Sequence, residues 1–274
     1  MLHVLPTVSI VIPAYNEEDT IKACVLAALD QTVPASEIIV VDNKSTDGTA
    51  SIVRALQTAY PDAPLIYFQQ NETQGLIPTR NFGLDRAQGE VVGRIDADSV
   101  LEPTWVEEVQ KAFADPAVAA CTGPVIYYDM PLRRWGHVAD DAIRRAMIVI
   151  TRDYHLLFGS NMALRASAWR MIRHEVCRDE LDELHEDIDI SIHLHEHKLK
   201  VAYSSDMVTG MSARRIDDNP RDYYNYVMRF ERTYKKHKIR NIAVRAPMAV
   251  LLSAYPALKA MRIAELRKTS NAAE

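Results

Sequence analysis

The stretch VVGRIDAD, residues 91–98, joins a short apolar run to two carboxylates separated by one alanine. Apolar runs of this length are typical of buried strands. If the extended backbone continues to the end of the stretch, the i, i+2 spacing directs Asp96 and Asp98 to one face. Two converging carboxylates repel each other unless a cation lies between them, and Mg²⁺ or Mn²⁺ binds through carboxylates together with substrate phosphates. The stretch therefore predicts a strand that ends at a metal-diphosphate site.

A structural role is the alternative for Asp98. Pro103 suits the first turn of a helix expected over residues 104–114, and Asp98 could cap that helix. An Asp-x-Asp pattern alone is a weak signal, so the rest of the chain has to decide between these roles.

Strand and helix signals alternate along the first half of the chain. Apolar runs precede the stretch at residues 8–12, 37–41 and 65–68. Helices are expected at about 17–30, 47–60 and 76–87. Such alternation favours an α/β fold, a Rossmann-like and mainly parallel sheet flanked by helices, with right-handed crossovers.

Polar residues follow the predicted strands where a ligand site is expected. In open parallel sheets, ligands bind beyond the carboxyl ends of the strands. Here those ends carry residues 15–17, 42–43 and 96–98. An acidic edge repels phosphate, but a metal can bridge carboxylate and phosphate, and Asp42 can accept a hydrogen bond from a nucleobase N–H.

These segments, in this order, resemble family-2 glycosyltransferases of the GT-A fold. The resemblance is carried by residues 8–18, 39–49, 75–84, 96–98, 159–165 and 186–189. It implies an inverting enzyme that uses a nucleotide sugar, with UDP-sugars as the default donors. We expect a GT-A domain over 1–220, divided into a nucleotide-sugar-binding half (1–123) and an acceptor and catalytic half (124–220). A basic, partly apolar, helical C-terminal extension (221–274) would follow.

The resemblance also implies a donor site. The residues expected there are Pro13, Tyr15, Glu17, Asp42, Arg80, Asp96, Asn161 and Arg214. Asp42 would read the base, and Arg80 would lie near the base or the diphosphate. Asp98 would be the principal ligand of Mg²⁺ or Mn²⁺, with Asp96 supporting the metal or the ribose. The structural alternatives are a strand stop for Pro13, turn and cap roles for Asp42 and Asp47, and a charge on a helix surface for Arg80.

The expected catalytic pair, Glu186 and Asp187, opens a stretch predicted to be helical to about residue 197. In inverting members of the family, the aspartate of such a pair takes the proton of the acceptor hydroxyl, so Asp187 is the expected base, with Glu186 beside it. General-base catalysis typically contributes about 10²–10⁴-fold. The structural alternative is favourable charge at a helix N-terminus, worth up to about 1 kcal/mol.

A zinc site is a rival interpretation of the same region. Four histidines lie close together, at positions 185, 193, 195 and 197. His193 and His197 are spaced i, i+4 and share a helical face with Asp189. The His-Glu-x-x-His arrangement is absent, because Asp189 holds the position of its second histidine. We therefore expect these histidines to form a helix surface facing solvent or the acceptor.

The chain departs from the family pattern in two places. Asn43 stands where many members carry a second acidic residue, which affects donor recognition. The Gln-x-x-Arg-Trp motif of processive synthases is absent, which predicts the transfer of single sugars. Arg214 and Arg215 follow a turn expected at 208–210 and could place a cation against the diphosphate, or form an exposed pair on a loop.

Composition limits the function classes. A net charge of −5 argues against a nucleic-acid binder. Three scattered cysteines argue against a disulfide framework and fit a reducing compartment, and residues 1–7 lack the basic start of a signal peptide. The sequence therefore predicts a cytoplasmic protein.

The C-terminal extension raises a membrane hypothesis. Basic residues between 232 and 268 flank an apolar stretch at 246–258, which is too short to span a bilayer. Such a segment suits a peripheral position on an anionic membrane, which would fit a lipid-linked acceptor in cell-envelope synthesis. The alternatives are a helix packed on the domain or against a second chain, so a dimer is possible.

Two other function classes remain as alternatives. A sugar-nucleotide pyrophosphorylase would carry an N-terminal glycine-rich phosphate loop followed by a lysine, and residues 9–18 contain no glycine. A non-catalytic nucleotide-binding protein would not depend on Asp187. The sequence does not fix the nucleotide, sugar or acceptor; Tyr127, Tyr128 and Trp135 are candidate stacking platforms for a sugar.

Overall fold

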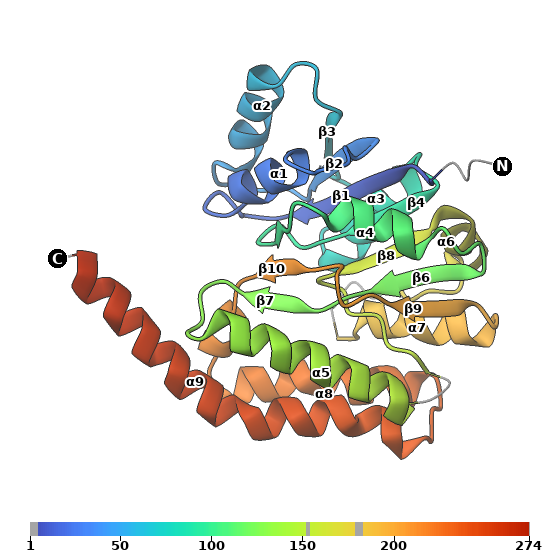
Figure 1. The fold of residues 1–274 in the computed structure, drawn as a ribbon, viewed down its shortest axis with the longest axis vertical. Helices are drawn as coiled ribbons and strands as arrows, with labels where there is room; N and C mark the ends of the chain where they lie inside the picture. The colour runs from blue at the N-terminus through green and yellow to red at the C-terminus, as the bar shows by residue number, and fades with distance from the viewer. Residues whose placement is uncertain (1–4, 152–153, 179–182, 274) are drawn as a thin grey trace.

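A seven-stranded sheet forms the centre of the molecule (Figure 1), as seen in a computed structural model that describes residues 5–151, 154–178 and 183–273. Residues 1–4, which begin the predicted donor half, lie outside these ranges. The strand order is β3-β2-β1-β4-β8-β6-β9. The strands are β1 (Val8–Ala14), β2 (Glu37–Asp42), β3 (Leu65–Gln69), β4 (Val91–Arg94), β6 (Val118–Thr122), β8 (Met162–Arg165) and β9 (Lys200–Tyr203).

Every neighbouring pair in this sheet is parallel except those of β8, which runs antiparallel to both β4 and β6. The predicted α/β class and mainly parallel sheet are therefore confirmed.

Helices cover both faces of the sheet. On one face lie α1 (Ile21–Leu29), α2 (Thr49–Ala59) and α4 (Trp105–Ala112), and on the other lie α3 (Leu76–Arg86), α6 (Ala166–Ile172) and α7 (Glu186–Glu196). Ile10 and Ile12 of β1 contribute to the first core and Val11 to the second, because side chains alternate along a strand. A strand covered on both faces reads as an uninterrupted apolar run, which is why β1 and β2 were recognisable in the sequence.

A second, three-stranded sheet was not predicted. It has the order β5 (Val100–Leu101), β10 (Thr209–Met211), β7 (Val125–Tyr127). The turn expected at 208–210 is wrong, because Thr209–Met211 forms the central strand. Strands of two or three residues carry too little periodicity to be recognised. Since β5 follows the Asp-x-Asp stretch and Thr104 holds the N-cap position of α4, Asp98 does not cap that helix.

The remaining helices build the lower part of the molecule in Figure 1. They are α5 (Arg133–Thr151), the 3₁₀ turns η1 (Arg214–Asp217) and η2 (Ile242–Arg245), α8 (Pro220–Lys236) and α9 (Ala246–Ala273). Tyr223 of α8 stacks on Tyr255 of α9 with ring centroids 4.1 Å apart. Arg262 is held by Asp129 and Asp217. The predicted helical extension is thus present, and its apolar stretch packs in part on α8.

Among the described residues, no helix is both long enough and apolar enough to cross a membrane.

Candidate active site

The Asp-x-Asp residues lie in a turn, which differs from the extended strand end expected. β4 ends at Arg94, and the Ser99 N–H donates to the carbonyl oxygen of Asp96 at 2.9 Å. The turn nevertheless brings both carboxylates to the wall of one cavity of about 430 Å³. Of the residues predicted for the donor and metal sites, those that line this cavity are Pro13, Tyr15, Glu17, Arg80, Asp96, Asp98 and Arg214.

Asp98 sits in an environment that favours a cation. Burial raises the pKa of its carboxyl to about 6; Arg214 opposes the shift, while Asp96 and Glu17 add to it. The Nε of Arg214 lies 3.0 Å from Oδ2 of Asp98, and its Nη2 lies 2.6 Å from Oε1 of Glu17. The guanidinium of Arg214 thus forms ion pairs with two carboxylates, Glu17 and Asp98, that are far apart in the sequence. This oxygen-rich, acidic set also fits a hard divalent cation.

Hydrogen bonds from backbone N–H groups to side-chain oxygens hold the loop that carries Glu17. Its N–H donates to Oγ1 of Thr49 at 2.8 Å, and the next residue, Glu18, accepts from the N–H of Gly48 at 2.7 Å. The loops after β1 and β2 are therefore fixed to each other at the cavity rim, where Tyr15 remains 50% exposed. An exposed aromatic ring at a rim is available for a flat ligand to stack on.

Asp42 does not line the cavity. It is buried; its Oδ2 accepts the Tyr67 hydroxyl at 2.6 Å and its Oδ1 accepts the Ser45 N–H at 3.0 Å. A nucleobase would have to displace or share these contacts to be read by this carboxylate. Base recognition by Asp42 stays a prediction.

Asn43, the departure from the family pattern, has a structural explanation. Its amide nitrogen donates to the carbonyl and side-chain oxygens of Gln70 at 2.8 and 2.7 Å and to the carbonyl of Thr73 at 3.1 Å. Its Oδ1 accepts the Gly75 N–H at 2.7 Å. An aspartate would direct a carboxylate at these three acceptor oxygens, so only the amide fits this buried junction.

Asn161 is not brought to the cavity either. It is completely buried, its Nδ2 donates to the carbonyls of Pro124 and Met207, and its Oδ1 accepts the indole N–H of Trp105 at 2.8 Å. These hydrogen bonds of the amide join the segment between β6 and β7, α4 and the segment before β10. The structure gives it a supporting role behind the site.

A buried ion network connects the Asp-x-Asp turn to the predicted catalytic pair. Arg80 of α3 contacts Glu186 and Asp96, and Arg94 of β4 contacts the same oxygen of Glu186, each at 2.5 Å. Burial alone would raise the pKa of Glu186, but the two guanidinium groups hold it well below its ordinary value. Glu186 is therefore ionised and fully engaged, which suits a positioning residue and not a proton acceptor.

Asp187 has the opposite electrostatic character. Burial raises the pKa of its carboxyl to about 6 and the neighbouring charge of Glu186 adds to the shift, while Arg94 opposes it. Its Oδ2 accepts the Gly159 N–H at 2.8 Å. Asp187 is not on the cavity wall itself, but Arg80 and Tyr226, which are, both interact with it electrostatically. A carboxylate that is ionised at pH 7 yet binds a proton readily is suited to act as a base.

Several residues of this site were not identified from the sequence, among them Arg94, Gly159 and Tyr226. Arg94 was counted as part of an apolar strand, and the signal available was a charge inside that run. Gly159 lies in a quoted family segment, and its importance is steric: a Cβ there would lie 2.2 Å from Nη2 of Arg94 and 3.0 Å from Oδ2 of Asp187. Only glycine allows the backbone N–H to approach the Asp187 carboxylate this closely.

The four histidines do not come together as the rival zinc interpretation would require, and the expected exposed surface is wrong for His185 and His193, which are buried. His185 packs on Phe230, His195 packs on Tyr154, and His197 contacts Glu175. Only His193 of the four takes part in potential metal-binding groups among the described residues, one with Asp189 and His237 and a more exposed one with Glu175 and Glu196. Asp189 already accepts a 2.7 Å hydrogen bond from Nε2 of His237, while Nε2 of His193 is buried without a hydrogen-bond partner among the described residues.

Comparisons with known proteins agree with this architecture. The model of the family described as "Glycosyl transferase family 2" matches residues 9–181, which is more than half of the chain. Glycosyltransferase AglE of Haloferax volcanii is 38% identical over 109 residues, covering 39% of this chain and 35% of that protein. The chain thus matches only about a third of this relative's length.

Solved structures share the fold over nearly the whole chain. The mannosyltransferase PcManGT of Pyrobaculum calidifontis, in complex with GDP-Man and Mn²⁺, superposes with a TM-score of 0.64 at 21% identity, covering 98% of this chain and 76% of that one. S. aureus TarS 1-349 in complex with UDP-GlcNAc superposes with a TM-score of 0.59 at 17% identity, covering 91% and 71%. Together with the family match, the likeness in fold leads to one conclusion: this chain belongs to glycosyl transferase family 2.

Proposed function

We propose that the protein is an inverting, metal-dependent glycosyltransferase that moves a single sugar from a nucleoside-diphosphate sugar to an acceptor hydroxyl. The observation that carries this proposal is the presence of two carboxyl groups of raised pKa, Asp98 on the wall of the acidic cavity and the buried Asp187. The ion network of Asp96, Arg80 and Glu186 connects the segments that carry them. Asp98 is suited to bind the metal ion that accompanies the donor, and Asp187 is suited to accept the proton of the acceptor hydroxyl.

The donor would occupy the cavity of about 430 Å³. In this proposal Pro13 and Tyr15 contact the base, Glu17 contacts the nucleoside, and Arg80 and Arg214 lie near the diphosphate. UDP-sugars are the favoured donors by family resemblance. PcManGT binds GDP-Man and TarS binds UDP-GlcNAc, so the choice of nucleotide differs between relatives of this fold.

Asp98, with Asp96, would hold Mg²⁺ or Mn²⁺. When bound, the metal would supply charge neutralisation for the departing nucleoside diphosphate. Arg214, which pairs with Asp98, would be free to turn its guanidinium toward the diphosphate, where a fork of N–H donors suits phosphate oxygens.

Asp187 would accept the proton of the attacking hydroxyl. The Gly159 N–H orients its carboxylate, and the ionised Glu186 keeps Arg80 and Arg94 away from full pairing with it. Attack from the face opposite the leaving group would invert the anomeric centre without a covalent intermediate. The absence of the processive motif supports the transfer of one sugar per cycle.

The same proposal divides the chain by task. Residues 1–123 would bind the nucleotide sugar, 124–220 would carry the acceptor and the base, and 221–274 would form a separate helical extension. In support, most residues that line the donor cavity, among them Pro13, Arg80 and Asp98, come from the first part, and Asp187 comes from the second; Arg214 and Tyr226 add side chains from the second part and the extension.

The acceptor is proposed to be a lipid-linked or cell-envelope glycan, reached at the cytoplasmic face of a membrane through residues 232–268. The second half of α9 exposes Met261, Ile263 and Leu266, with Arg267 and Lys268 following. Apolar side chains beside cations are suited to the surface of an anionic bilayer.

Metal-dependent donor binding is tested with Asp98→Asn. Calorimetric titration of UDP, GDP, dTDP and CMP in the presence of Mn²⁺ should give tight binding of one nucleotide, lost with chelator and at least about tenfold weaker in the variant, because a charged metal ligand is removed. Asp62→Asn, an exposed site, is the matched control. Binding of the nucleotide that is indifferent to metal and to Asp98→Asn would contradict the metal assignment.

The base is tested with Asp187→Asn. Since an amide cannot accept the proton, kcat should fall by about 10²–10⁴-fold with little change in nucleotide affinity. In the wild type the rate should fall about tenfold per pH unit below pH 6, because Asp187 must be ionised to act. Full activity of the variant on every donor and acceptor tried would instead favour a non-catalytic nucleotide-binding protein.

Membrane contact is tested by co-sedimentation with vesicles. The wild type should bind vesicles containing phosphatidylglycerol and not pure phosphatidylcholine, and 0.5 M salt should weaken the binding about severalfold or more. Met261→Ser/Ile263→Ser/Leu266→Ser should abolish it, whereas Tyr60→Ser, an exposed aromatic residue elsewhere, should not. No sedimentation with anionic vesicles would exclude the membrane role.

A further inference from the structure

A second cavity, of about 570 Å³, lies against the small sheet beside the proposed active site. Its floor is a row of cross-strand neighbours, Val100 of β5, Gly210 of β10 and Ile126 of β7, which are paired in register. The adjacent row, Leu101, Thr209 and Val125, is buried on the opposite face. Because side chains alternate along strands, the small sheet has one face in the core and one face in this cavity.

Gly210 leaves the middle of the floor hollow. A Cβ at this position would lie 3.0 Å from the carbonyl oxygen of Val100 and would point among the neighbours that surround the cavity. The central strand thus contributes backbone and no side chain, and the floor remains apolar at Val100 and Ile126. Such a floor suits the apolar face of a sugar ring or the first carbons of a lipid.

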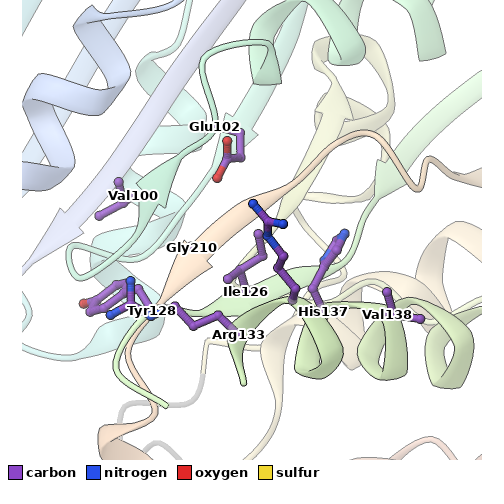
Figure 2. A pocket seen from close by; sticks show the side chains of 9 residues that line it. Val100, Glu102, Ile126, Tyr128, Arg133, His137, Val138 and Gly210 are labelled. Carbon is purple, nitrogen blue, oxygen red and sulfur yellow. The ribbon is translucent and has the colours of Figure 1, made fainter. Parts of the chain in front are cut away.

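The wall of the cavity is cationic. Arg133, Arg134 and His137 of the first turns of α5 line it together with Val138. Figure 2 shows His137 and Arg133 on the α5 side and Glu102 across the opening from His137. Neither Arg133 nor Arg134 makes a hydrogen bond or ion pair with a residue in the described ranges, and both are exposed.

His137 adds an unpartnered polar atom. Its Nδ1 is buried and has no hydrogen-bond partner among the described residues. A buried ring nitrogen without a partner costs free energy unless a ligand or water satisfies it. The guanidinium groups of Arg133 and Arg134 line the same cavity and likewise have no acceptor among the described residues.

The cavity is connected to the proposed catalytic machinery. Tyr128, which lines it, donates its hydroxyl to the carbonyl oxygen of Asp98 at 2.9 Å. Gly210 lies in this cavity, while the next residue of β10, Met211, lines the donor cavity. The two cavities are therefore on either side of the same short strand. A molecule bound over Gly210 would be separated from the donor cavity by the thickness of this one strand.

We infer that this second cavity binds the acceptor through a phosphate ester, with Arg133 and Arg134 holding the phosphate oxygens and the apolar floor holding the adjoining group. The inference rests on the proposed glycosyl transfer for its function, but not for the binding itself. The planar donor fork of arginine matches phosphate oxygens in pairs. Glu102, opposite, is placed to accept hydrogen bonds from hydroxyl groups of the same molecule.

Phosphate binding is tested by calorimetry in the presence of chelator. Two probes separate the sources of the phosphate: glucose 6-phosphate, and dihexanoyl phosphatidic acid below its micelle concentration. At least one should bind to the wild type, and Arg133→Ala/Arg134→Ala should weaken it at least tenfold. Arg133→Lys/Arg134→Lys keeps the positive charge but loses the planar donor fork, so its affinity for the probe should lie between those of the wild type and the double alanine variant. A preference for the sugar phosphate would identify a soluble acceptor, and a preference for the lipid a lipid headgroup.

Arg145→Ala is the matched control, because Arg145 is exposed on the same helix, pairs with Asp141 and does not line the cavity. Binding of neither probe to the wild type, or equal binding by the double alanine variant, would overturn the inference. So would a loss confined to Arg214→Ala, which would put the phosphate in the donor cavity. Nucleotide binding with Mn²⁺ should be unchanged in Arg133→Ala/Arg134→Ala and in Arg145→Ala, because none of these residues lines the donor cavity. Its absence in the wild type would count against the proposed function and leave the phosphate site standing.

Discussion

The buried contact of Glu186 with Arg80 and Arg94 is the interaction on which the site depends. Each of these three charges is nearly or fully buried, and a charge in that environment is tolerated only when it is paired. The pairing joins α7, α3 and β4, and through Arg80 it extends to Asp96 in the turn after β4. The acidic turn and the start of α7, which carries the proposed base, are thereby fixed to each other by charge.

The balance of charges around this contact gives the neighbouring carboxylates of Glu186 and Asp187 different pKa values. Glu186 and Asp96 together match the two arginines, so no cation is left to pair fully with Asp187. Burial and the nearby charge of Glu186 then raise the pKa of Asp187, while the same arginines lower that of Glu186. Neighbouring residues of one helix turn thus differ in electrostatic character, and in the proposed function Glu186 is the fixed anion and Asp187 the proton acceptor.

The features of the fold that depend on local sequence pattern could be predicted from the sequence. The first four strands of the central sheet, the helices between them, the GT-A fold and family membership are confirmed, because buried parallel strands and family motifs are visible in a single chain. The small sheet was missed because β5 and β7 are too short to show a period. Asp42 and Asn161 show a different limit: the motif marks them, yet their side chains are engaged inside the protein, by Tyr67 and by Trp105. Whether Arg94 and Gly159 meet Asp187 depends on long-range packing, which no local pattern encodes.

The most direct test of this account is the pH dependence of sugar transfer in Glu186→Gln, measured at saturating Mn²⁺ so that Asp98 stays ligated. Glutamine keeps the size of the side chain but removes the negative charge that raises the pKa of Asp187 and releases Arg94 toward it. Although kcat will fall, the account predicts that the acid limb of the profile moves to lower pH by about one unit or more. An acid limb that stays near pH 6, or moves upward, would contradict the claim that this ion network sets the protonation of the catalytic base.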